Sequence, residues 1–524
     1  MKINKNKFLN FFLIISGILF SLYCIFSLGL SYDQVFHIEN GERRLKYLFS
    51  LGRYDYYDIL HLRYYPGLYD TISALFSSIF PRNFYYESFY LLNFIVGLAG
   101  LIGLKKIVKF FFGSEIAKYF FLISIFSPII FGHLSINPKD TIIATSHFWI
   151  LYYVVKYLKT EDVYLRKNIS FKIGIFVGLG TGVRVIFLGT LIPIILFLLL
   201  EILIFKRFIK KIIFKDFIYH ITIIIFTSYI LLVLCWPNTH SNILVEPFKI
   251  FFESLNDISQ GVQVSYFKGI FYETKFTPWN YLFTNVLYKF PSIFLFGFLF
   301  FFIFYKNLAT SLNNIKDFDY KIVISLILLI LPVIIAIFLK LKIHDGLRYF
   351  LYLIPFFNFF PAIYLYYLLK NLDKIYNKIL IVFLIPFFII FLIKFFVISP
   401  YHYTYLNIFN DIFLKKDSFE NDYWGTSLKE LIKEFSYKID NKKFVKISVC
   451  GVNPNNVKYY LRKYDIKNFD IVDLNERFDY AILVNRAIHS NNDEKLTCYL
   501  KFNNKNTYLR VNKSFIDLSK IVEY

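Results

Sequence analysis

The chain has 524 residues, of which 57% are hydrophobic, and its mean hydropathy is +0.50. Apolar stretches of about 20 residues, the length that crosses a bilayer core of roughly 30 Å, recur along it. This composition excludes a soluble globular protein and predicts an α-helical multi-pass membrane protein. The formal net charge is +22, but Lys and Arg lie mostly between the apolar stretches, so we attribute the charge to membrane orientation and predict no nucleic-acid binding.

About eleven apolar stretches predict transmembrane helices. They cover 8–30, 88–105, 116–132, 141–158, 171–184, 186–205, 217–235, 291–305, 322–340, 349–370 and 379–399. The segment 1–7 is basic, but the apolar run after it is too long for a signal peptide, and no small-residue cleavage site follows. We therefore expect an uncleaved first helix with its N-terminus in the cytoplasm.

Short basic loops support this orientation. Lys and Arg concentrate in the segments 105–109, 159–167, 206–211, 306–321 and 374–378. With a cytoplasmic N-terminus, all of these segments lie inside, as the positive-inside rule requires. The odd number of helices then predicts a C-terminus outside the membrane.

The predicted membrane domain covers 1–400, with large outside loops at 31–87 and 236–290. The first loop mixes aromatic and charged residues, which is typical of helices that lie along a membrane interface. The tail, 401–524, is expected to be periplasmic, with a small α/β domain from about 427.

Within the tail, alternating apolar residues predict strands at 445–449, 469–474 and 480–485, and a helix at 455–463. Cys450 and Cys498 would pair if the tail is extracytoplasmic. Two cysteines so far apart in sequence are more often unpaired, and the sequence favours that alternative.

Polar clusters gather at the predicted outside ends of the helices, and the first contains Asp33. Asp33 and His37 are four residues apart, so they share a face of a helix that leaves the membrane. A carboxylate partly shielded from water suits a general base for a hydroxyl or an amine. The alternative is an ordinary polar helix end.

Cationic side chains lie in the other clusters on this side. In NPKDT (137–141), Lys139 and Asp140 start a helix, where an anion can bind; the alternative is a turn in which the two residues pair. Arg184 ends GTGVR (180–184), and arginine at a membrane rim is usually paired or functional. The same expectation applies to Arg348; the alternative is that Asp345, three residues before it, simply neutralises its charge.

Two further clusters complete the candidate site. RYYPGLYD (63–70) places Arg63 and Tyr65 beside a Pro-Gly turn, where Arg63 could bind phosphate. His344 begins HDGLR (344–348). Several cations around one carboxylate suit a phosphorylated donor embedded in the membrane, because the cations would hold the leaving phosphate while Asp33 deprotonates the acceptor.

The motifs resemble, in order, the GT-C superfamily of polyprenyl-phosphate-dependent glycosyltransferases, and more narrowly family 39, which includes protein O-mannosyltransferases and bacterial aminoarabinose transferases. The similar stretches are SYDQVFH (31–37), RYYPGLYD (63–70), HLSINPKDT (133–141), GTGVR (180–184), WPN (236–238), FTPWNYL (276–282), HDGLRYFLYLIP (344–355), SPYHYTYLN (399–407) and NDYWGTS (421–427). The resemblance implies a GT-C fold with a cavity that faces outside, and an acidic base in the first outside loop, which is Asp33 here.

The resemblance also implies substrate-binding residues around the base. Our candidates are His37, Arg63, Tyr65, Lys139, Asp140, Arg184, His344, Asp345 and Arg348. Many relatives have Asp-Glu where this chain has Asp33-Gln34, so a second carboxylate is missing there. No spacing of His and acidic residues is typical of a metal site, so the sequence identifies no cofactor. A divalent metal ion stays an open alternative that no motif supports.

We therefore predict a glycosyltransferase of the bacterial inner membrane. It would transfer a sugar from a polyprenyl-phosphate-linked donor to a lipid, glycan or protein acceptor on the periplasmic side. A transporter or flippase of lipid-linked substrates is the first alternative, but it predicts internal repeats and charges near mid-membrane. A non-enzymatic envelope scaffold is the second, and it leaves the cations near Asp33 unexplained.

Overall fold

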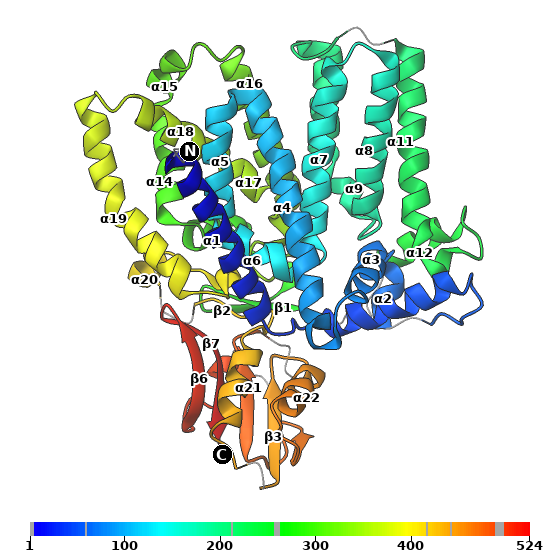
Figure 1. Cartoon of the computed structure of the whole chain (residues 1–524), viewed down its shortest axis with the longest axis vertical. Coiled ribbons are helices and arrows are strands. Elements are labelled where there is room, and N and C mark those ends of the chain that lie inside the picture. The colour runs from blue at the N-terminus through cyan, green and yellow to red at the C-terminus, as the bar shows by residue number, and fades with distance from the viewer. Residues whose placement is uncertain are drawn as a thin grey trace.

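The computed structural model describes residues 5–57, 60–210, 213–255, 263–414, 418–440, 443–487 and 497–524. Long helices form a broad layer, and the tail forms a small domain with a sheet at one end of that layer (Figure 1). The predicted fold class, a helical membrane domain followed by a small α/β domain, is confirmed.

Each predicted apolar stretch is a helix or a broken helix. The bounds are α1 Lys5–Ser27, α4 Tyr85–Phe112, α5 Ser114–Ile125, α6 Pro128–Ile136, α7 Asp140–Lys159, α8 Val163–Thr181, α9 Phe187–Thr190, α10 Ile192–Leu200, α11 Phe214–Leu234, α13 Tyr281–Lys289, α14 Ser292–Ile303, α15 Tyr305–Ser311, α16 Phe318–Phe338, α17 Ile354–Phe357, α18 Phe359–Lys370 and α19 Ile375–Val397.

Length and composition identify fewer full spans than the eleven predicted. Within the described ranges, the helical segments Arg82–Phe112, Phe214–Leu234, Phe318–Phe338 and Ile375–Val397 are each long and apolar enough to cross a membrane. The pairs α5–α6 and α13–α14 add two spans if each pair, bent by 66° and 113°, counts as one. Proline causes both breaks, because Pro128 and Pro291 disfavour helical backbone in the residue before them.

The basic loops gather at one end of the helical layer. The turns between α4 and α5, α7 and α8, and α15 and α16 lie at the end opposite the tail domain (Figure 1). This arrangement agrees with the alternation predicted from the sequence. The side of the membrane that each end faces stays a prediction.

The described parts of the two loops that were predicted to lie outside form helices and a hairpin at the tail end of the layer (Figure 1). The first contains α2 Gln34–Phe49, η1 Leu60–Tyr64, α3 Leu68–Ser77 and η2 Arg82–Phe84. The second contains η4 Pro237–Thr239, α12 Glu246–Leu255, η5 Thr274–Phe276, and a hairpin of β1 Val264–Phe267 and β2 Ile270–Glu273. Both loops therefore cover the end of the bundle where the polar clusters emerge.

The tail contains η7 His402–Thr404, α20 Ile408–Phe413, α21 Leu428–Ser436, α22 Pro454–Lys463, η8 Cys498–Leu500 and a five-stranded sheet of order β4-β3-β5-β7-β6. The strands are β3 Val445–Cys450, β4 Phe469–Val472, β5 Tyr480–Val484, β6 Thr507–Lys513 and β7 Ile516–Glu523. The predicted helix and three strands are present. The β6–β7 hairpin was missed because its turn residues, Ser514 and Phe515, have positive φ without the Gly or Asn that marks such turns.

The two tail cysteines form a disulfide. Cys450, at the end of β3, is bonded to Cys498 in η8, so the favoured expectation of unpaired cysteines is wrong. Cys24 and Cys235 are free and buried.

Thiol labelling tests this pairing. Protein purified from membranes without reductant, then denatured, should label at Cys24 and Cys235 alone, and at all four cysteines after reduction. Cys450→Ser should expose Cys498 to label without reduction, whereas the control Cys24→Ala should remove one label only. Four labelled thiols before reduction would contradict both the disulfide and an oxidising location for the tail.

Candidate active site

The backbone around Asp33 is fixed by the tail. Asp33 is the N-cap of α2, and its side chain makes no capping hydrogen bond. In the preceding loop, Gly29 N donates to Thr426 O and Tyr32 N donates to Trp424 O, both at 2.9 Å. The tail therefore sets where the Asp33 carboxylate projects.

Asp422 shapes the tail segment that makes these bonds. Its carboxylate is fully buried and accepts hydrogen bonds from Thr426 N at 3.0 Å, Ser427 N at 3.1 Å and the Tyr403 hydroxyl. Burial raises the pKa of Asp422 to about 6, although these bonds act in the opposite direction. The NDYWGTS motif is therefore a tight turn built around its acidic residue.

Six predicted site residues meet in one small polar cavity. It is lined by Ser31, Asp33, His37, Asn137, Pro138, Lys139, Asp140, Arg184, Arg348 and Trp424. Burial alone would raise the pKa of Asp33, but the surrounding charges of Lys139, Arg486, His37 and Arg348 hold it below its usual value. The carboxylate is consequently ionised at neutral pH.

The turn before α7 separates Lys139 from Asp140. The Asn137 side chain accepts from Asp140 N at 3.0 Å and donates to Asp140 Oδ2 at 3.0 Å, while Asp140 Oδ1 lies 3.9 Å from Arg184 Nη1. Lys139 Nζ lies 4.6 Å from the centre of the Tyr65 ring. Over the described part of the chain Lys139 makes no ion pair, so the alternative of a Lys139–Asp140 pair is not observed and this cation is available to a ligand.

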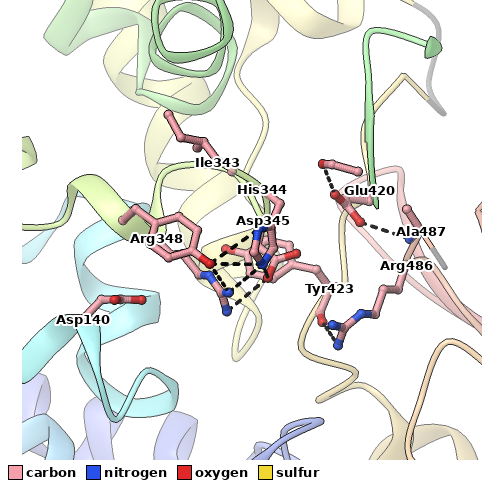
Figure 2. A network of polar contacts seen from close by, with 12 residues as sticks. Asp140, Ile343, His344, Asp345, Arg348, Glu420, Tyr423, Arg486 and Ala487 are labelled. Carbon is pink, nitrogen blue, oxygen red and sulfur yellow. Dashed lines mark hydrogen bonds and ion pairs between the residues drawn. The ribbon is translucent and has the colours of Figure 1, made fainter. Parts of the chain in front are cut away.

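Arg348 is bound within its own motif, as Figure 2 shows. Its Nη1 lies 3.0 Å from Asp345 Oδ2, and its Nη2 donates to His344 Nε2 at 2.9 Å and to the Tyr349 hydroxyl at 2.7 Å. Burial lowers the pKa of His344 to about 4, so the neutral ring can accept this bond. The guanidinium also lies 5.1 Å from the Trp424 ring. Asp345 thus compensates Arg348, which was the alternative stated above.

His37 is held by a carboxylate that the sequence did not place in the site. Its Nδ1 lies 3.0 Å from Asp70 Oδ1, and Asn40 Nδ2 donates to Asp70 Oδ2 at 2.8 Å. Burial would raise the pKa of Asp70, but His37 and these hydrogen bonds hold it below its usual value. The contact orients the imidazole on the wall that it shares with Asp33.

Arg63 is directed away from the cavity. Its Nη2 lies 3.0 Å from Glu253 Oε2 in α12, and its carbonyl accepts from Trp236 Nε1 at 2.8 Å. The structure therefore brings Arg63 to the second outside loop and leaves it outside the residues that line the Asp33 cavity.

Arg44 organises the Pro-Gly turn and was missed. It is fully buried and donates to the carbonyls of Tyr65 at 3.0 Å, Cys235 at 2.5 Å and Pro66. A side chain at Gly67 would collide with it, because an added Cβ would lie 2.5 Å from Arg44 Cζ. Nothing in the charged sequence of α2 distinguished this arginine from its less buried neighbours Glu42 and Arg43.

Arg486, from the tail, was also missed. Its Nη1 donates to Tyr423 O at 2.9 Å (Figure 2). Its guanidinium lies 4.1 Å from the centre of the ring of Tyr32, the residue before Asp33. A single arginine after a strand carries no sequence signal. Its charge acts on both Asp33 and Asp345.

Glu420 joins the tail to the β1–β2 hairpin. It accepts from Ser265 Oγ at 2.5 Å and from Ala487 N at 3.0 Å (Figure 2). Burial, with Asp345 nearby, raises the pKa of Glu420 to about 7. In the described ranges, no group of three or more His, Cys, Asp or Glu residues is placed to hold a metal ion.

Comparison with known proteins finds similarity in structure. No protein-family profile and no curated protein sequence matches the chain. ArnT from Cupriavidus metallidurans in the apo state superimposes over 99% of this chain and 98% of its own, with a TM-score of 0.53 and 11% identity. The same enzyme bound to undecaprenyl phosphate superimposes over 97% of this chain and 97% of its own, with a TM-score of 0.53 and 11% identity.

An oligosaccharyltransferase from Archaeoglobus fulgidus, in complex with Zn and sulfate, aligns over 87% of this chain and 64% of its own, at a TM-score of 0.44 and 11% identity. The ArnT superpositions run through both the helical layer and the tail domain, since they cover almost all of both chains. The chain is therefore a multi-pass membrane protein with the GT-C fold of ArnT.

Proposed function

We propose that the chain is a membrane glycosyltransferase that moves a sugar from a polyprenyl-phosphate-linked donor to an acceptor on the extracytoplasmic face of the bacterial inner membrane, with Asp33 as the base. One observation carries the proposal. Arg184 lines the polar cavity that contains Asp33, and the next two residues, Val185 and Ile186, line a large apolar cavity. A polyprenyl phosphate has a charged phosphate and a long apolar chain, so it needs a polar cavity beside an apolar one.

The apolar cavity suits a polyprenyl chain. It has a volume of about 930 Å³ and lies between α7, α8, α10, α11 and α12. The side chains that line it include Val154, Val177, Ile194, Ile224 and Phe248. Lipid-binding cavities are mostly apolar, with a few placed polar groups at one end. ArnT, which shares the fold, binds undecaprenyl phosphate, and this supports the same donor class here.

The geometry supports direct displacement. The acceptor oxygen or nitrogen attacks the anomeric carbon, the bond from that carbon to the phosphate oxygen breaks, and the electron pair leaves with the phosphate. The acceptor proton passes to Asp33. Lys139 and Arg184 stabilise the charge that develops on the leaving phosphate, whereas Arg348, already compensated by Asp345, holds the cavity wall at Trp424.

The low pKa of Asp33 fits this timing. An ionised carboxylate orients the acceptor by accepting its proton in a hydrogen bond. The proton becomes acidic enough to transfer only as the new bond to the sugar forms. Asp33 therefore positions the acceptor first and accepts its proton late.

The first prediction concerns Asp33. Cells that lack the chain should accumulate the lipid-linked sugar donor, and the wild-type chain should clear it. Asp33→Asn removes the proton acceptor but keeps the size of the side chain, so turnover should fall by about 10²-fold or more and the donor should persist. Mass spectrometry of lipid extracts measures this.

Glu39→Gln is the matched control, because Glu39 is an exposed carboxylate on the same helix; it should clear the donor normally. Normal clearance by Asp33→Asn would sink the assignment of the base, and no accumulation in cells lacking the chain would sink the proposed function.

A second prediction concerns Lys139 and the donor phosphate. Lys139→Gln should raise the KM for the donor by about tenfold, the effect of losing one charge-assisted contact of about 1.4 kcal/mol, and should lower kcat as well. Lys275→Gln, an exposed lysine of the same end of the molecule that pairs with Glu273, should change neither. An unaltered donor KM in Lys139→Gln would remove Lys139 from the phosphate site.

A third prediction uses the pH dependence. Activity requires ionised Asp33, so it is lost as pH falls through the pKa of this group. Arg486 helps to keep that pKa low; Arg486→Gln should therefore raise it and move the acidic limb of the kcat/KM profile to higher pH. Arg477→Gln, an exposed arginine of the tail, should leave the limb in place. A reduced rate with an unshifted limb in Arg486→Gln would contradict the electrostatic role.

A further inference from the structure

A cationic groove lies between the membrane domain and the tail, apart from the Asp33 cavity. It has a volume of about 620 Å³. One wall comes from η2 and the start of α4, with Arg82 and Tyr86, and the other comes from α22, with Lys458, Tyr459 and Arg462. The rings of Tyr86 and Tyr459 meet edge to face at 4.9 Å, so the two walls touch at the groove.

Helical periodicity gives α22 two unlike faces. Val457 and Leu461 are fully buried, whereas Lys458 and Arg462, four residues apart, are exposed on the groove side. The apolar face docks the helix on the tail. The charged face contributes nothing to that core and is left for a ligand.

The positive charge of the groove is not neutralised. Glu87, next to Tyr86, is already bound by Lys429 Nζ at 3.1 Å and by Lys463 Nζ at 3.6 Å. Arg82, Lys458 and Arg462 make no ion pair with any residue in the described ranges. An anion that entered the groove would meet three uncompensated cations.

The groove lies where a membrane-spanning helix ends. Arg82 begins the apolar segment Arg82–Phe112, which is long enough to cross a bilayer. Tyrosine at the end of such a segment lies at the level of the lipid head groups, and a long arginine side chain near a helix end extends to the same level. Lys458 and Arg462 of the tail therefore face the depth at which lipid phosphates occur.

We propose that this groove binds the phosphate of an anionic lipid head group and so fastens the tail to the membrane surface. The inference goes beyond the proposed glycosyltransferase activity and does not depend on it. Phosphate suits the chemistry, because an arginine on each wall can bind its oxygens and a lysine can add charge. The lipid would then bridge the two domains.

Lipid binding to the purified full chain tests the proposal. Native mass spectrometry with phosphatidylglycerol, and separately with zwitterionic phosphatidylcholine, gives the affinity of each. Lys458→Gln/Arg462→Gln should weaken phosphatidylglycerol binding by about 25-fold, since each cation near a lipid surface contributes about fivefold. The control is Lys438→Gln/Lys467→Gln, which changes two exposed lysines of the tail that do not line the groove. It removes the same amount of charge and should bind phosphatidylglycerol as the wild type does.

Two further measurements complete the test. Both groove side chains are exposed, so the variant should melt at the wild-type temperature without lipid; Arg82→Gln, on the other wall, should lose binding by about fivefold. Binding of inorganic pyrophosphate alone distinguishes a lipid from a soluble phosphate. If the wild type binds pyrophosphate, the groove variant does not, and the wild type shows no preference for phosphatidylglycerol, then the groove binds a soluble phosphate and the lipid proposal is wrong. Wild-type lipid affinity in the groove variant, or an equal loss in the control, would overturn the proposal.

Discussion

Two backbone hydrogen bonds between the loop after α1 and the tail hold the candidate base in place. Asp33 has no capping contact of its own, so its direction follows from the path of Gly29 to Tyr32. Thr426 and Trp424 of the tail hold that path together with Tyr90 of α4. The tail is therefore part of the cavity wall. The membrane domain and the tail also superimpose together on ArnT, over almost the whole length of both chains.

Charge pairing decides which groups remain for a substrate. Asp345 compensates Arg348, and Asp140 lies near Arg184. Burying charges is costly unless they are paired, so these contacts let arginines remain at a membrane rim. Lys139 has no such partner among the described residues and is placed to meet an incoming anion. The cavity thus combines Arg348, which is tightly paired and shapes the wall, with Lys139 and with Arg184, whose contact with Asp140 is long at 3.9 Å.

Periodicity and motif order predicted much of this arrangement from the sequence, because apolar stretches and helix starts are local signals. They located the helices and brought Asp33, Lys139 and Arg184 to one face; the roles of these residues stay predictions. Contacts between distant segments have no local signal, so Arg486 and Arg44 were missed. Arg63 was misplaced for the same reason, since its partner Glu253 lies in another loop.

Arg486 lies close to the end of the chain, whereas Asp33 follows the first helix, and both belong to one site. Domains generally fold from the N-terminus as synthesis proceeds. In the proposed topology, the cavity next to Asp33 would stay open to water through most of synthesis and would close only after the last part of the chain had crossed the bilayer. If the chain is the glycosyltransferase proposed above, export of the tail would be the step that completes its site, and a chain stalled before that step would hold the candidate base exposed to water.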